Sequence, residues 1–263
     1  MSLKVGFIII ARMKSTRLPK KLTLKIVGKT IISLMIERLK ESKLLDEVIL
    51  ATSTNQEDGI LCDIADQEKI KCFRGSENDV LKRIYDAAKE YNLDYILHVT
   101  GDSPFVSYDF FEDVIETYKE TNADLITNFD LPHGFFFYGI KVDAIKKVLE
   151  MKATDDTEIW GDYFMKTNKF KVIKLEIPEK YKRKYRLTVD YIEDYEFLKK
   201  LFEKSGEDIH KKPTSKIIEF LDKNPDIVKI NEDCEEKYKK RFDSQKKMEL
   251  KQEYNEDVGK LGV

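Results

Sequence analysis

The chain has 263 residues, of which 41% are hydrophobic and 37% are charged. This composition is typical of a soluble globular protein and excludes an intrinsically disordered chain. The 47 lysine and arginine residues nearly balance the 49 aspartate and glutamate residues. The resulting net charge of -2 excludes a general electrostatic attraction to nucleic acid or to a membrane surface.

Short apolar runs alternate with helical patterns over the first half of the chain. The expected strands are residues 4–10, 47–52, 70–75, 94–102 and 123–128. The expected helices are residues 30–43, 56–67, 76–92 and 110–120. Strands separated by single helices predict an α/β fold with a mostly parallel sheet and helices on both faces. Ligands of such sheets bind beyond the carboxyl ends of the strands.

The alternation weakens after residue 130. The expected elements there are an aromatic run that turns helical (131–150), a helix (155–168), a strand (170–178) and a strand end that leads into a helix (185–204). We therefore expect one main domain over residues 1–230, with a small lobe within 131–180. Residues 231–263 form a charged extension, and we expect a solvated helix or a partly disordered tail there, with partner binding as the alternative.

The cysteines and apolar runs indicate the cellular setting. Cys62, Cys72 and Cys234 lack the spacing of a metal site, and their odd number argues against a disulfide framework. We therefore expect a reducing, cytoplasmic environment. No apolar run approaches the ~18 residues of a membrane span. The opening run VGFIII is too short for the core of a signal peptide.

The first strand leads into a basic segment, ARMKSTRLPKK (11–21). Arginine forms forked hydrogen bonds to phosphate oxygens, lysine adds a point charge, and Ser15 and Thr16 add hydroxyl donors. The segment contains no glycine, so it is neither a Walker A loop nor a dinucleotide fingerprint. We expect it to bind a polyphosphate; the alternative is a solvated basic turn.

Two aspartates follow apolar runs elsewhere in the chain. Asp102 stands in VTGDSP (99–104) and Asp190 in RLTVDYIED (186–194). Mg²⁺ favours one or two carboxylates together with substrate oxygens and water. If both aspartates meet the basic loop at one edge of the sheet, the three segments form a site for a metal and a polyphosphate. Taken singly, each aspartate could also belong to an ordinary turn.

At these residues the sequence resembles a known family. The loop ARMKSTRLPKK is similar to the A-R-x-x-S-T-R-L-P-x-K signature of cytidylyltransferases that activate acidic sugars, among them the 3-deoxy-manno-octulosonate and acylneuraminate enzymes. The likeness is greatest to the spore-coat polysaccharide branch. Further matching segments follow in the same order over roughly residues 3 to 200: ATSTN (51–55), FRGSENDVL (73–81), TGDSP (100–104) and LTVD (187–190).

The resemblance implies a CTP-dependent enzyme with a nucleotide-binding sheet, Mg²⁺ as cofactor and a small lobe that mediates homodimerisation. Its product would be a CMP-linked acidic sugar for surface polysaccharide, released with pyrophosphate. The implied nucleotide-binding residues are Ala11, Arg12, Ser15, Arg17, Lys21, Arg74, Ser76 and Thr100. The implied catalytic residues are Arg17, Lys21, Asp102 and Asp190, of which the two aspartates would bind the metal.

The acceptor region departs from the family pattern. The segment PHGFFFYG (132–139) has aromatic residues where the spore-coat branch has acidic ones. His133, Phe136 and Tyr138 are therefore candidate acceptor contacts, because a sugar ring can stack on an aromatic wall. The alternative is that these aromatics, like Trp160, pack the lobe or a dimer contact.

Two other functions stay open from the sequence. The protein could be a nucleotidyltransferase of the same fold that uses another nucleoside triphosphate, because one sequence does not establish base selectivity. It could also be a non-catalytic member of the family that binds a nucleotide or serves as a scaffold. The altered acceptor segment and the charged tail suggest this alternative. The intact basic loop and both aspartates argue against the second.

Overall fold

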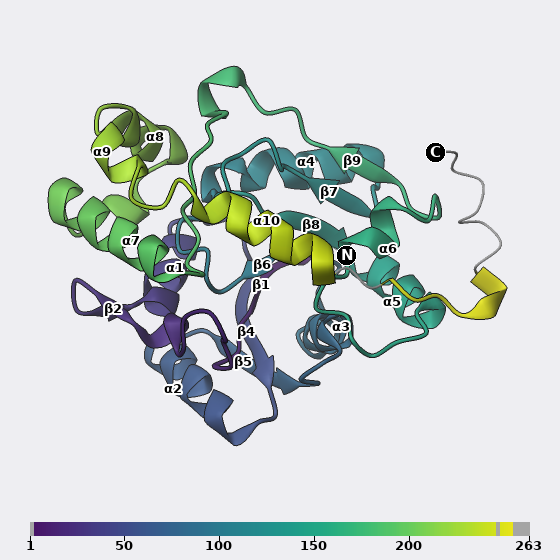
Figure 1. Cartoon of the computed structure of the whole chain (residues 1–263). Helices are drawn as coiled ribbons and strands as arrows, with labels where there is room; N and C mark the ends of the chain where they lie inside the picture. Colours follow the sequence, from purple (N-terminus) through teal and green to yellow (C-terminus); the bar gives the residue numbers. More distant parts are fainter. Residues whose placement is uncertain (1–2, 246–247, 255–263) are drawn as a thin grey trace.

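The computed structural model describes residues 3–245 and 248–254, and Figure 1 shows how its elements are arranged. A seven-stranded sheet has the order β5-β4-β1-β6-β8-β7-β9, and a separate two-stranded sheet pairs β2 with β3. The strands are β1 (Val5–Ile10), β2 (Lys25–Ile26), β3 (Lys29–Thr30), β4 (Glu47–Ser53), β5 (Lys71–Gly75), β6 (Tyr95–Thr100), β7 (Leu125–Thr127), β8 (Tyr138–Lys141) and β9 (Val172–Lys174).

Strand β1 lies in the interior of the sheet, between β4 and β6, because its apolar side chains fill both faces. All six of its residues are buried, and its alternate residues enter opposite hydrophobic clusters: Phe7 and Ile9 on one side, Ile8 and Ile10 on the other. It pairs in parallel with β4 and β6. The carboxyl ends of these three strands therefore share one edge of the sheet.

Helices cover both faces of the sheet. The helices are α1 (Ile31–Leu39), α2 (Gly59–Gln67), α3 (Val80–Glu90), α4 (Phe111–Thr121), α5 (Val142–Met151), α6 (Gly161–Met165), α7 (Ile192–Ser205), α8 (Thr214–Asp222), α9 (Pro225–Val228) and α10 (Cys234–Gln245). Residues of α1, α2, α4, α7 and α8 pack in one cluster, and those of α3, α5 and α6 in the other. The predicted mostly parallel α/β fold is confirmed.

Some expected elements differ from the sequence prediction. The aromatic run before α5 contains β8, which pairs antiparallel with both β6 and β7. The helix expected over 155–168 is reduced to α6, because Thr157 Oγ1 donates a 2.9 Å hydrogen bond to Asp79 and ties this loop to the start of α3. The strand expected before α7 is absent from the described residues; Leu187 and Val189 instead donate backbone hydrogen bonds to His133 and Asp102.

The expectation from the cysteine count is wrong in one respect. Cys62 in α2 and Cys72 in β5 form a disulfide, and Cys234 is a buried free thiol. Three cysteines can still form one disulfide when two of them lie opposite each other on a helix and a strand that pack together. The cytoplasmic setting stays a prediction. Within the described residues, no helix is both long and apolar enough to span a membrane.

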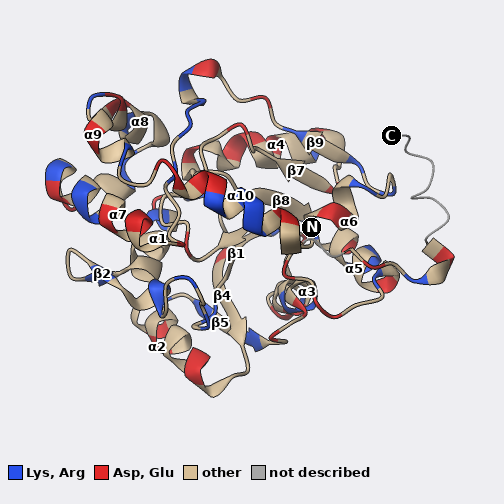
Figure 2. Cartoon of the chain, viewed as in Figure 1, with Lys and Arg blue, Asp and Glu red and all other residues tan. Residues whose placement is uncertain are grey.

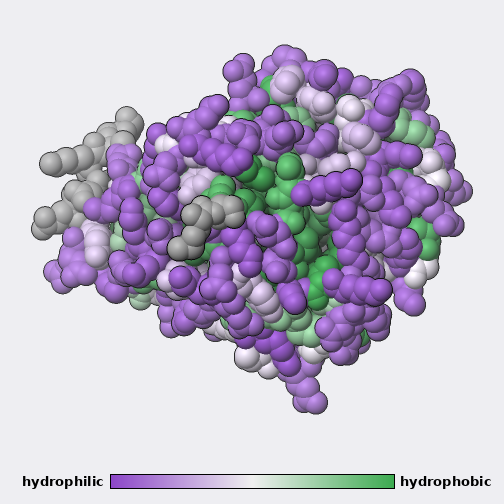
Figure 3. All heavy atoms as spheres, turned by 180° about the vertical axis from the view of Figure 1, so that it is seen from behind, coloured by the Kyte–Doolittle hydropathy of each residue, from purple (hydrophilic) through white to green (hydrophobic). Residues whose placement is uncertain are grey.

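The surface of the molecule is uneven in polarity. Figure 3 shows the face opposite the view of Figure 1, where a strip of hydrophobic side chains crosses a mostly hydrophilic surface. Figure 2 shows basic and acidic residues alternating along α10.

The small lobe and the homodimer implied by the family resemblance stay predictions.

Candidate active site

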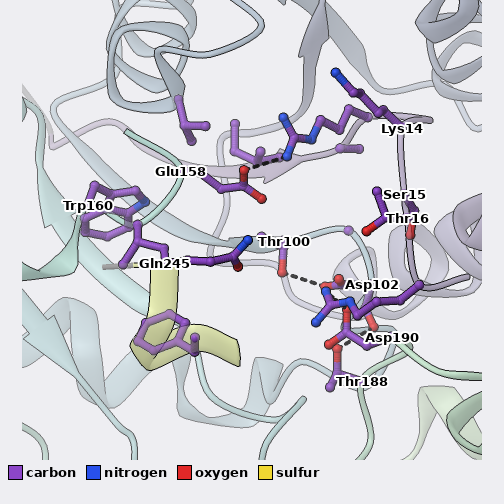
Figure 4. Close-up of a pocket in the computed structure, with 18 of the residues that line it drawn as sticks. Lys14, Ser15, Thr16, Thr100, Asp102, Glu158, Trp160, Thr188, Asp190 and Gln245 are labelled. Atoms are coloured by element: carbon purple, nitrogen blue, oxygen red, sulfur yellow. Dashed lines mark hydrogen bonds and ion pairs between the residues drawn. The ribbon is translucent and has the colours of Figure 1, made fainter. Parts of the chain in front are cut away.

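A pocket of about 730 Å³ opens at the carboxyl ends of the central strands. Its wall includes Ala11, directly after β1, and Thr100 at the end of β6. The pocket is lined at one side by Lys14, Ser15, Thr16, Asp102, Thr188 and Asp190, and at the other by Glu158, Trp160 and Gln245 (Figure 4). The pocket therefore lies where a parallel sheet binds its ligands.

The basic loop after β1 is anchored to the next strand–helix connection. The backbone N–H of Met13 donates a 2.6 Å hydrogen bond to Asp58 Oδ1, and Asp58 also accepts from the Ser53 hydroxyl. Farther along, Lys20 adopts a left-handed conformation (φ 56°) at the start of a 3₁₀ turn, and its neighbour Lys21 is buried. The turn directs Lys20 away from the pocket and Lys21 into it.

Asp102 and Asp190 converge on a single ammonium group. Lys21 Nζ lies 2.7 Å from Asp190 Oδ1 and also pairs with Asp102. The two segments are held side by side, because Val189 N–H donates a 2.8 Å hydrogen bond to the backbone oxygen of Asp102. Burial by itself would lower the pKa of Lys21, but the two carboxylates outweigh it and raise this pKa.

A second layer of charge holds Asp190 in place. Arg17 pairs with Asp190 Oδ1, and Arg186 Nη2 donates to its Oδ2 at 2.8 Å. Arg186 is itself buried and pairs with Asp194 at 3.0 Å. Burial by itself would raise the pKa of Asp190, but Lys21 and Arg17 lower it well below the ordinary value. Asp190 is therefore an ionised carboxylate surrounded by cations.

Asp102 and Asp190 are residues of this pocket that could hold a metal ion. Both carboxylates already share one cation, the Lys21 ammonium, so the position between them accommodates positive charge. Among residues 3–245 and 248–254, no group of three or more histidine, cysteine, aspartate or glutamate side chains could hold a metal by itself. A divalent cation held by Asp102 and Asp190 would thus need further oxygens from substrate and water.

Most of the predicted site residues line this pocket. They are Ala11, Arg12, Ser15, Arg17, Lys21, Thr100, Asp102, His133 and Asp190. Thr100 Oγ1 donates a 2.6 Å hydrogen bond to Asp102 Oδ1, which orients that carboxylate. The structure thus brings Lys21 together with Asp102 and Asp190, which are 81 and 169 residues away in the chain.

Four predicted contacts lie outside the pocket. Arg74 donates hydrogen bonds to the backbone oxygens of Ser53 and Asn55, at 3.0 and 2.6 Å, which turns its side chain toward the β4 end. Ser76 Oγ accepts from Asp79 N–H at 3.1 Å at the start of α3. Neither Arg74 nor Ser76 lines the pocket, and a direct contact of these two side chains with the nucleotide stays a prediction.

The predicted aromatic acceptor contacts also have other neighbours. Phe136 packs on Phe129 with ring centroids 5.2 Å apart, and Tyr138 packs on Trp160 at 4.7 Å. Neither Phe136 nor Tyr138 lines the pocket, so the alternative of core packing describes their positions. Trp160, in contrast, is buried and also forms part of the pocket wall.

Helix α10 contributes four pocket residues that the sequence interpretation missed. They are Tyr238, Arg241, Phe242 and Gln245. The signal was present in the sequence, because Cys234, Tyr238 and Phe242 recur every four residues and form one face of a helix. The many charged residues between them concealed this stripe. The solvated-tail interpretation therefore describes only the outer face of α10.

Arg83 also lies in the pocket wall and was missed by the sequence interpretation. It is fully buried on α3, and its Nη1 donates to the backbone oxygens of Ser76 and Glu77. Its Nε and Nη2 have no hydrogen-bond partner in the part of the chain that the structure describes. Burial, followed by the neighbouring charge of Arg12, lowers the pKa of Arg83 to about 10.

Comparison with known proteins places this site in context. The spore coat polysaccharide biosynthesis protein SpsF of Bacillus subtilis is 30% identical over 232 residues, which cover 84% of this chain and 95% of that protein. The 3-deoxy-manno-octulosonate cytidylyltransferase of Chloroherpeton thalassium is 32% identical over 123 residues, or 46% of this chain and 48% of that enzyme. The structure of a cytidylyltransferase from Leptospira borgpetersenii superposes with a TM-score of 0.79 at 32% identity, covering 86% of this chain and 97% of that one.

Fold and site together define the class, which is that of α/β nucleotidyltransferase enzymes. The family follows from a more specific match, because a model described as cytidylyltransferase covers residues 6–248. The chain therefore belongs to the cytidylyltransferase family, and the resemblance seen in the sequence is confirmed.

Proposed function

We propose that this protein transfers the cytidylyl group of CTP to a hydroxyl of an acidic sugar, giving a CMP-linked sugar and pyrophosphate. One observation carries the proposal: the ammonium group of Lys21 pairs with both the half-buried Asp102 and the buried Asp190. These three side chains line a large pocket beside the basic loop. Family membership supports CTP as the nucleotide.

The charge of the pocket suits a triphosphate. CTP carries about four negative charges, which repel a nucleophile that approaches its α-phosphorus. Arg12, Lys14, Arg17 and Lys21 line the pocket and can neutralise that charge. Asp102 and Asp190 would hold Mg²⁺, which when bound neutralises phosphate charge.

The side chains of this protein act by positioning and by electrostatics. Arg17 and Lys21 would stabilise the pyrophosphate as the bond between the α-phosphorus and its bridging oxygen breaks. The acceptor hydroxyl forms the new bond to the α-phosphorus from the opposite side, and its proton passes to solvent. Arg186 holds Asp190 in place, and Thr100 orients Asp102. No covalent enzyme intermediate is required.

The acceptor is proposed as a class. One relative is named as a cytidylyltransferase of 3-deoxy-manno-octulosonate, which is a sugar acid. Another is named as a protein of spore coat polysaccharide biosynthesis. His133 is the predicted acceptor residue that lines the pocket. Its Nδ1 lies 2.8 Å from Glu235 Oε2, so the side chain is oriented within the wall before any ligand arrives.

A turnover screen tests the proposal. Each of CTP, UTP, GTP and ATP is mixed with Mg²⁺ and a panel of acidic and phosphorylated sugars, and pyrophosphate release is followed. We expect release with CTP and at least one sugar acid. Release with a different nucleotide in place of CTP would favour the alternative enzyme. Nucleotide binding without release from any pair would favour a non-catalytic member.

A further inference from the structure

Helix α10 is attached to the framework of the candidate site at its amino-terminal half. Glu235 accepts a 2.9 Å hydrogen bond from Arg186, the same residue that holds Asp190. The guanidinium carbon of Arg186 also lies 5.1 Å from the centre of the Tyr238 ring. The position of α10 is therefore determined by the residues that position the carboxylates.

The carboxyl-terminal half of α10 borders the open pocket. Gln245 extends from the end of the helix into the pocket, between Trp160 and Thr100 (Figure 4). One turn earlier, Arg241 Nη2 lies 3.5 Å from Thr16 Oγ1 in the basic loop. A residue 225 positions from that loop thus adds a guanidinium group beside it.

The loop cations that line the pocket are already paired. Arg12 lies 2.7 Å from Glu158, and Lys14 lies 3.4 Å from Glu77. Arg17 pairs with Asp190, and Lys21 with both site aspartates, as described above. A triphosphate that contacts these cations must compete with carboxylates that hold them.

Arg241 differs from the loop cations and from its neighbours on α10. Lys239 and Lys240 pair with Glu235 and Glu236 one turn away, at 3.6 and 2.6 Å. Arg241 lines the pocket and has no carboxylate partner among the residues described. Its forked donors can therefore bind phosphate oxygens without breaking an ion pair.

We propose that Arg241 is a phosphate-binding residue, by which α10 adds a cation to the triphosphate site beside the basic loop. The inference rests on the proposed use of CTP. It adds a cation outside the loop motif and gives α10 a direct role in nucleotide binding.

Calorimetric titration of the full chain with CTP and Mg²⁺ tests the proposal. Arg241→Ala should weaken CTP binding by about 10-fold, the loss expected for one charge-assisted contact. Arg241→Lys, which keeps the charge, should recover much of the affinity. Lys240→Ala is the matched control, because Lys240 is an exposed cation of the same helix outside the pocket, and should bind as the unmodified protein does.

The outcomes separate this inference from the proposed function. If the unmodified protein binds CTP and Arg241→Ala binds it as tightly as Lys240→Ala, the role of Arg241 is refuted and the proposed function stands. If the unmodified protein does not bind CTP, both fail. Arg241 is exposed, so all three variants should melt within a few degrees of the unmodified protein. Equal melting temperatures exclude misfolding as the cause of weaker binding.

Discussion

At the scale of single residues, Lys21 and Lys20 show how much the backbone decides. Both are lysines of the same basic motif, adjacent in sequence. The left-handed conformation of Lys20 and the turn that follows bury Lys21 between two carboxylates and leave Lys20 exposed. The family motif indicated Lys21 as the lysine of the site. The structure explains why Lys21, and not Lys20, lies in the pocket.

This pair gives a controlled prediction. Lys21→Ala should reduce pyrophosphate release by at least about 100-fold, because it removes a buried charge next to the reacting phosphates. Lys20→Ala should retain near-normal turnover, since Lys20 lies outside the pocket. Steady-state kinetics on both variants measure the difference. Equal losses in the two would show that total loop charge, and not the buried ammonium, is what matters.

At the scale of elements, the contact between residues 133–139 and the segment before α7 positions much of the site. Gly134 has φ +100°, and an added Cβ would lie 2.4 Å from the backbone carbon of Leu187 and 2.6 Å from Thr188 N. These neighbours are backbone atoms and cannot rotate away. A glycine here therefore allows the two segments to pack closely, with His133 on one and Asp190 on the other.

A second glycine supplies the control. Gly28 also has a positive φ of +80°, but nothing lies within 4 Å of its added Cβ. Gly28→Ala should cost about 1–2 kcal/mol of unfolding free energy from backbone strain alone. Gly134→Ala should cost at least about 2 kcal/mol more, because of the steric overlap. Urea unfolding measures both, and equal costs would contradict the close packing described here.

At the scale of the whole molecule, a buried histidine links the core to pH. His98 lies in the central strand β6 and donates from Nδ1 to the backbone oxygen of Ile8 at 2.9 Å. Burial, opposed only in part by this hydrogen bond, lowers the pKa of His98 to about 4. The folded protein therefore holds this imidazole neutral in a range where the unfolded chain protonates it.

The sign of the pH effect follows from that difference. Between about pH 6.5 and 4 the unfolded state binds more protons, so stability falls as the pH falls through this window. At pH 4 the contribution of His98 lowers the free energy of unfolding by on the order of 3 kcal/mol. Burial also lowers the pKa of His210, so His210 adds to the loss of stability at low pH. Urea unfolding of His98→Gln across this range should show a shallower slope. An unchanged slope would mean that His98 does not titrate on unfolding.

The sequence alone determined the class of fold, because hydrophobic periodicity reports which face of an element is buried and alternation of strand and helix implies parallel pairing. It also indicated the loop cations and Asp102, since motif residues near strand ends reach the same edge of a parallel sheet, and Asp190 through its place in the LTVD motif. These inferences depend on local chemistry and on a general rule of topology.

Only the tertiary structure decided which side chains line the pocket. Arg74 lies in a segment that matches the family and Tyr138 in the aromatic acceptor segment, yet hydrogen bonding and core packing turn them elsewhere. Arg241 and Gln245 lie in a segment that looked solvated, yet Glu235 and Tyr238 attach their helix to the site. The direction of a side chain depends on contacts between residues far apart in the chain, and sequence patterns record such contacts only weakly.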